Sequence, residues 1–128
     1  MSYKNAEAPK PFPVVAIGAS AGGLEAITEL LKYLLPDLGM CYVVIQHLSP
    51  THESILPELI DRQTTMKVYK VTDGIEVFAN CIYVIPPNTF MSIVDGHLRI
   101  FPRIKIDGVM HPIDFFLPRL LKYTSKMQ

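Results

Sequence analysis

The stretch VVAIGASAGG, residues 14–23, decides the fold, because an apolar run in it stops at a turn rich in glycine. The run at residues 14–17 shows no alternation of polar and apolar residues, which is typical of a strand buried on both faces of a parallel sheet. After the glycines, leucine and isoleucine recur at helical spacing up to Leu34, with charged residues on the opposite face. A strand, a glycine turn and an amphipathic helix in this order indicate an α/β fold.

The remainder of the chain continues the alternation of strands and helices. The further elements expected are a strand at 42–45, a helix at 54–62, a weak strand at 66–71, a strand at 81–85, a hairpin formed by 90–94 and 98–101, and a helix from 113 to about 123. The hairpin signal is the pair Asp95-Gly96 between its two strands. Pro118 is expected to kink or shift the last helix. The sequence thus predicts a three-layer, mainly parallel, doubly wound sheet with a β-hairpin insertion.

The order of these elements also predicts the domain organisation. Residues 1–12 are polar and carry prolines, which suits a leader or linker, and residues 13–128 form the N-terminal part of one domain. A crossover helix normally delivers the chain to another strand, and none follows the last helix. We therefore expect a domain truncated at its C-terminus, with an exposed sheet edge through which a homodimer can form.

Composition excludes several classes of function. The chain has 128 residues, of which 49% are apolar and 19% charged, so it can bury the core of one domain. Twelve basic residues balance twelve acidic ones, which disfavours nucleic acid as a partner. No stretch approaches the roughly 20 apolar residues of a membrane-spanning helix, so we expect no membrane insertion and a cytoplasmic protein. Cys41 and Cys81 lie in strand-like surroundings without metal-type spacing, and we expect two reduced thiols, no metal and no cofactor.

The glycine turn has three standard interpretations. A dinucleotide site needs a glycine where this chain has Ser20, and a phosphate loop needs a Gly-Lys-Ser/Thr that is absent. The third interpretation is a nucleophile elbow, because residues 18–22 read G-x-S-x-G between a strand and a helix. Gly18, Gly22 and Gly23 would then shape the turn, and the backbone N–H of Ala21 would face a developing oxyanion. A serine that only caps the helix stays an open alternative.

A candidate base follows the second predicted strand. His47 comes directly after it, and the carboxyl ends of neighbouring parallel strands meet at one edge of a sheet. A serine hydroxyl needs such a base to become a good nucleophile. His52 and Glu53 fit no standard metal-ligand set with His47, while a loop histidine satisfied by backbone groups stays the alternative for His47.

Several blocks of the sequence resemble one family, the bacterial chemotaxis methylesterase (CheB) catalytic domain. The blocks are residues 14–26, 43–50, 83–88 and 112–116, in the family's order and with compatible gaps. The likeness is greatest to methylesterase domains that share a chain with a CheR-like methyltransferase. The resemblance implies hydrolysis of γ-glutamyl methyl esters on methylated chemoreceptor-like proteins, and possibly glutamine deamidation, with Ser20 as nucleophile and His47 as base.

The chain departs from the family pattern at two places. Ala21 stands where many members have threonine, which leaves only its backbone N–H as an oxyanion donor. The family's catalytic aspartate lies in a later glycine-rich loop that this chain does not contain, and neither Asp107 nor Asp114 suits that role. We therefore expect residues 1–128 alone to be inactive or nearly so. Two other functions stay open: a non-catalytic interaction module with the methylesterase fold, and a domain that binds phosphate or another small ligand at the glycine turn.

Overall fold

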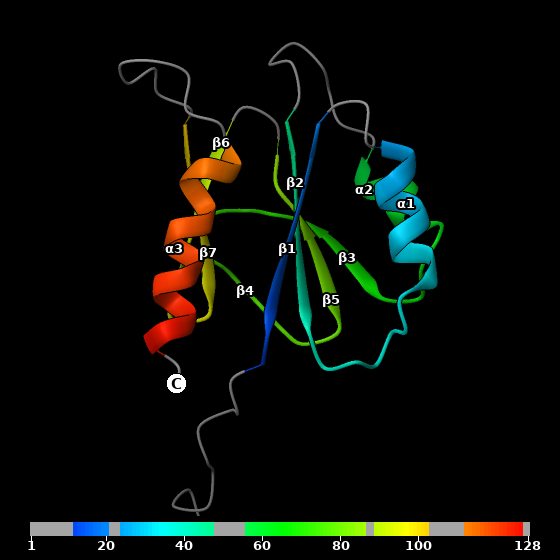
Figure 1. The fold of residues 1–128 in the computed structure, drawn as a ribbon, viewed down its shortest axis with the longest axis horizontal. Coiled ribbons are helices and arrows are strands. Elements are labelled where there is room, and N and C mark those ends of the chain that lie inside the picture. Colours follow the sequence, from blue (N-terminus) through cyan, green and yellow to red (C-terminus); the bar gives the residue numbers. More distant parts are fainter. Residues whose placement is uncertain (1–11, 21–23, 48–55, 87–88, 103–111, 127–128) are drawn as a thin grey trace, which may run out of the picture.

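The expected α/β fold is confirmed by a computed structural model, which describes residues 12–20, 24–47, 56–86, 89–102 and 112–126 (Figure 1). Its elements are β1 (Val14–Ser20), α1 (Leu24–Tyr33), β2 (Cys41–His47), α2 (Leu56–Asp61), β3 (Lys67–Lys70), β4 (Ile75–Glu76), β5 (Cys81–Val84), β6 (Thr89–Val94), β7 (His97–Pro102) and α3 (Pro112–Lys126).

The central sheet has four parallel strands in the order β1-β2-β5-β3. Its interior strands are the apolar runs of the sequence: residues 41–45 of β2 and residues 81–84 of β5 are all buried. A strand that is apolar on both faces must be covered on both faces, and this requirement produces the layers of the domain.

Helices cover both faces of the parallel sheet (Figure 1). On one face, Ile27 and Leu31 of α1 and Ile60 of α2 pack against alternate residues of β2 and β5. On the other face, Phe116 and Leu120 of α3 pack with the intervening residues of these strands. The mainly parallel, three-layer arrangement that the sequence predicted is confirmed.

The predicted hairpin belongs to a larger unit, a three-stranded antiparallel sheet in the order β4-β7-β6. Its tight turn is at the expected place, because Asp95 and Gly96 both adopt positive φ angles, 49° and 75°. The two-residue strand β4 was not predicted. It pairs with the start of β7, where Glu76 lies opposite His97.

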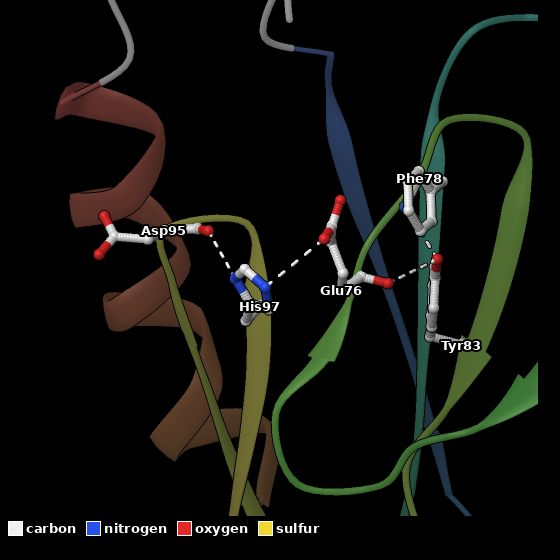
Figure 2. Close-up of polar contacts among 5 residues, drawn as sticks. All are labelled: Glu76, Phe78, Tyr83, Asp95 and His97. Atoms are coloured by element: carbon white, nitrogen blue, oxygen red, sulfur yellow. Dashed lines mark hydrogen bonds and ion pairs between the residues drawn. The ribbon is translucent and has the colours of Figure 1, made fainter. Parts of the chain in front are cut away.

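A tyrosine hydroxyl ties this small sheet to the central one (Figure 2). Tyr83 is buried in β5, yet its hydroxyl receives a hydrogen bond from the N–H of Phe78 at 2.8 Å and donates one to the carbonyl of Glu76 at 3.2 Å. Burial raises the pKa of this hydroxyl, so it stays protonated and keeps donating. These two hydrogen bonds therefore fix the segment between β4 and β5 to the side chain of a central strand.

Two helices differ in extent from their predictions. Helix α3 runs from Pro112 to Lys126, longer at both ends than expected, and it continues through Pro118. Pro118 is exposed, and Pro112 occupies the first position, where a proline N–H would have no partner in any case. Helix α2 is confirmed over Leu56–Asp61, while the first residues predicted for it lie outside the described part of the chain.

Candidate active site

The two predicted catalytic residues end neighbouring strands. Ser20 is the last residue of β1 and His47 the last residue of β2. In the parallel ladder between the strands these two residues are register partners, at the end of a run that starts with Val14 opposite Cys41. Since neighbouring strands lie about 4.8 Å apart, the backbones of Ser20 and His47 are as close as two strands allow. The structure thus brings these two residues together at the carboxyl edge of the sheet.

The register that pairs them is fixed at the opposite end of the strands. There the N–H of Cys41 donates a hydrogen bond to the carbonyl of Pro13 at 2.9 Å. Between the two ends, Val43 and Val44 are completely buried on opposite faces. A shift of one residue would exchange the two apolar faces of β2, so packing holds the register.

Gly18 has a role that sequence reasoning missed. The structure places it inside β1, and a Cβ atom built there would lie 2.5 Å from Cδ1 of Ile113, in the first turn of α3. Cβ atoms essentially never come that close to another atom, so a larger residue at position 18, two residues before Ser20, would have to displace the end of the Ile113 side chain. A G-x-S spacing could suggest a turn glycine, but nothing in the sequence indicated that α3 was its neighbour.

Part of the predicted site lies outside the described residues. Ala21, Gly22 and Gly23 of the glycine turn lie there, as do His52, Glu53 and Asp107, which the sequence did not favour as site residues. The oxyanion role of the Ala21 N–H and the turn itself therefore stay predictions.

His97 and Asp114 lie on elements other than β1 and β2. His97 starts β7; its Nδ1 lies 2.7 Å from the carbonyl of Asp95 and its Nε2 3.7 Å from Oε1 of Glu76 (Figure 2). Asp114 is an exposed residue in the first turn of α3. Asp114 thus lies at the start of a helix, where a carboxylate is favoured.

The buried thiol of Cys41 is a poor nucleophile. Burial, and in smaller measure the charge of nearby Cys81, raises the pKa of Cys41 to about 12. The thiol is therefore protonated near neutral pH, and a protonated thiol reacts slowly. Both thiols are reduced, as the sequence predicted.

Two further features bear on the kind of site. Within the described ranges, no three histidine, cysteine, aspartate or glutamate residues gather in a way that could hold a metal ion. Among the helices described, none has the length and apolar character needed to cross a membrane.

The chain is similar to known methylesterases in sequence. The family model described as CheB methylesterase matches residues 15–127. The chain is 31% identical over 84 residues to a protein-glutamate methylesterase/protein-glutamine glutaminase of Methanosarcina acetivorans, with 66% of this chain and 24% of that protein covered. It is 35% identical over 88 residues to one of Burkholderia thailandensis, with 69% and 24% covered. It thus spans about a quarter of the length of these relatives.

The fold is also similar to that of a solved structure. The catalytic domain of Thermotoga maritima CheB methylesterase superposes with a TM-score of 0.74 at 23% sequence identity. The match covers 88% of this chain and 61% of that one.

Proposed function

This chain belongs to the CheB methylesterase family, and we propose that Ser20 and His47 are the nucleophile and the base of a protein-glutamate methylesterase site. The observation that carries the proposal is the register pairing of these two residues at the carboxyl ends of β1 and β2. A serine and a histidine on adjacent strand ends have the closeness that general-base activation of a hydroxyl requires. Relatives named protein-glutamate methylesterase/protein-glutamine glutaminase support the substrate class, a γ-methyl ester or γ-amide of a protein side chain.

The proposed reaction has two steps. His47 takes the proton of the Ser20 hydroxyl while its oxygen attacks the ester carbonyl, and the oxyanion formed is held by the backbone N–H of Ala21. His47 then returns the proton to the methoxy group, which leaves as methanol, and Ser20 is acylated. Water, deprotonated by His47, releases the glutamate and restores the serine. With glutamine as substrate, ammonia leaves in place of methanol.

A third group should orient His47, and we propose that it is an aspartate outside residues 1–128. The match to 61% of the solved domain supports this proposal, because the other 39% can supply it. Loss of the acid in a serine protease lowers kcat about 10⁴-fold. Residues 1–128 alone should therefore release almost no methanol from a peptide that carries a γ-methyl glutamate. A clear rate from this chain, abolished by Ser20→Ala, would contradict the external aspartate.

The pairing of Ser20 with His47 can be tested without the acid. A fluorophosphonate probe, which phosphonylates activated serines with loss of fluoride, should label Ser20 faster than Ser125, an exposed serine of α3. His47→Ala should slow the labelling of Ser20 by about 10²-fold or more, since a general base contributes that much. His97→Gln is the matched control and should have no effect. Equal labelling of both serines, or an unchanged rate after His47→Ala, would instead favour the non-catalytic interaction module.

Two proposals on context come from the resemblance alone. We propose that the substrate is a methylated chemoreceptor-like protein acted on in the cytoplasm, and that a CheR-like methyltransferase domain is part of the same protein. Cell fractionation tests the first statement. Reading the gene beyond the codon for Gln128 tests the second, and a stop codon there would refute it.

A further inference from the structure

The two cysteines of the chain begin neighbouring strands of the parallel sheet. Cys41 is the first residue of β2 and Cys81 the first residue of β5, and these two strands pair with each other. Each cysteine comes one residue before the register pair of Tyr42 with Ile82. The sequence contains no other cysteine, so its two thiols start adjacent strands at the same level of the sheet.

Both cysteine side chains lie on the same face of the sheet. Cys41 and Cys81 belong to the core cluster under α3, together with Val43 of β2 and Tyr83 of β5. This agrees with the rule that residues two apart in a strand share a face. Neighbouring parallel strands lie about 4.8 Å apart, and the Cα atoms that a disulfide joins lie roughly 4.4–6.8 Å apart. The fold thus gives the two cysteines a spacing and a common face that suit a disulfide.

Hydrogen bonds hold the starts of the two strands together. The N–H of Asn80 donates to the carbonyl of Met40 at 2.8 Å, and the side-chain oxygen of Asn80 accepts from the N–H of Gly39 at 2.7 Å. Asn80 has a positive φ angle of 64°, which asparagine adopts more readily than most residues. The residue before Cys81 therefore binds both residues before Cys41, and this keeps the two thiols side by side.

The two thiols interact in the reduced protein but differ in their access to solvent. Burial, and in smaller measure Cys81, raises the pKa of Cys41, and such a charge interaction weakens with distance. Cys41 is completely buried, whereas Cys81 is 8% exposed. A small oxidant therefore reaches the sulfur of Cys81 first, and Cys41 is the thiol that lies behind it.

We propose that Cys41 and Cys81 are a site of reversible oxidation, where hydrogen peroxide converts the two thiols into a disulfide between β2 and β5. The sulfur of Cys81 attacks one peroxide oxygen, the O–O bond breaks, and water leaves with the thiol proton, so that Cys81 becomes a sulfenic acid. The sulfur of Cys41 then attacks the sulfur of Cys81, the S–O bond breaks, and a second water leaves with the proton of Cys41. The two sulfur atoms lose the two electrons that the peroxide gains.

The disulfide would strengthen a short connection within the sheet. The ladder between β2 and β5 has three register pairs, whereas the ladder between β1 and β2 has seven. A covalent link that closes the loop between residues 41 and 81 restricts the unfolded chain more than the folded one. The link lies at the end of β2 opposite His47, so we expect it to leave the proposed esterase site unchanged (Figure 1).

The test is treatment of the folded full chain with hydrogen peroxide, followed by unfolding in urea and labelling of free thiols with N-ethylmaleimide. Both maleimide labels should be lost, peptide mapping should find Cys41 linked to Cys81 within one chain, and dithiothreitol should restore both labels. Labels are counted in place of total mass, because peroxide also oxidises methionine and the chain has six of these.

Three variants test the order of the steps and the need for adjacent strands. In Cys41→Ser the sulfenic acid of Cys81 should accumulate and react with dimedone. In Cys81→Ser the remaining thiol should react with peroxide at least about tenfold more slowly, because a buried, protonated thiol is inert. Cys81→Ser with Lys67→Cys is the matched control: it moves the second thiol to the register partner of Cys81 on β3, which is exposed but two strands away from Cys41, and no link should form.

The oxidised chain should also be more stable than the reduced one. Its midpoint of urea unfolding should rise by roughly 1 M, because the closed loop restricts the unfolded chain. Dithiothreitol reduces the disulfide but leaves methionine sulfoxide, which needs its own reductases, so the reversible part of the shift belongs to the cysteine pair.

Three results would overturn the proposal. The thiols keep their labels or lose them in a form that dithiothreitol does not restore, the disulfide joins two chains and not two strands of one chain, or the internal link forms without a rise in the unfolding midpoint. None of these measurements depends on Ser20 or His47, so this proposal and the proposed function fail separately.

Discussion

The two edges of the parallel sheet, β1 and β3, each pair with one neighbour but are built from different residues. Strand β3 has four residues and begins and ends with exposed lysines, Lys67 and Lys70. Lys70 Nζ lies 3.0 Å from Oε1 of Glu58 on α2. Charged residues on a short strand disfavour pairing with another chain. Strand β1 has seven residues and no charge. The difference teaches that β3 is an edge strand protected by charged residues, whereas β1 has the composition of an interior strand although it lies at an edge.

The largest expected effect is on the free energy of unfolding. It tests whether the faces of β1 are tightly packed although one of its edges is unpaired. Gly18→Val should lower the free energy of unfolding by about 1–3 kcal/mol, because added carbons collide with Ile113. Urea unfolding measures the loss. The loss should shrink when Ile113→Ala removes the colliding atoms, and an equal loss in both backgrounds would contradict the contact.

The next effect is on the pH dependence of stability and concerns Cys41 of β2, the strand that pairs with β1. Its thiol ionises near pH 9.0 when unfolded and at about 12 when folded, so its contribution to stability is complete below pH 9 and is lost as the pH rises toward 12. The loss is at most about 1.4 kcal/mol per pH unit. Under reducing conditions, the wild type should lose more stability than Cys41→Ala between about pH 8 and about pH 10. If stability falls equally with pH in both proteins, the Cys41 thiol is not the cause of the loss. The loss would then come from groups that both proteins contain, such as Tyr83 and Tyr123.

A third variant would make the β3 edge resemble the β1 edge. Replacing Lys67 and Lys70 together by valine should change the free energy of unfolding by no more than about 0.5 kcal/mol. It should, however, raise the mean mass in sedimentation as concentration increases, because the edge loses its protection. Lys32→Gln with Lys122→Gln removes the same charge elsewhere and should leave the mass unchanged. If both double variants behave alike, net charge and not the edge controls association.

The smallest effect is local to the ion pair at the β3 edge. The hydrogen bond from Lys70 lowers the pKa of Glu58, and Lys70→Gln should return it toward its ordinary value. The pair contributes stability above the unfolded pKa of Glu58 and loses it as the pH falls through the folded one. Both side chains are half exposed or more, so global stability should hardly change. An NMR titration of Glu58 measures the shift, with Lys67→Gln as the control that should not move it.

Much of the fold could be predicted from local signals. The apolar runs of β1 and β2 indicated buried parallel strands, and Asp95-Gly96 marked the turn between β6 and β7. The nearness of Ser20 and His47 followed from the general rule that parallel strands end at one edge. The register partnership itself depends on which strands are neighbours, and that order is a tertiary property.

Features that depend on distant contacts were beyond sequence reasoning. The two residues of β4 carry no periodic pattern; β4 is positioned by pairing with β7 and by the carbonyl of Glu76 accepting from Tyr83. Gly18 was read as a turn residue because its true neighbour, Ile113, is 95 positions away in the chain. An exposed edge was expected, but only the strand order shows that β1 and β3 are the edge strands of the described sheet.

The ladder between β1 and β2 makes the spacing of Ser20 and His47 a discrete quantity. Strands slide past one another only in whole residues, about 3.3 Å at a time, and each single step exchanges the side chains that pack on the two faces of the sheet. Substitutions in the surrounding loops can therefore alter what reaches this pair, but they cannot tune its backbone separation by fractions of an ångström. Adaptation of the proposed site to a new substrate therefore has to change the groups around Ser20 and His47, and not the distance between the backbones of these two residues.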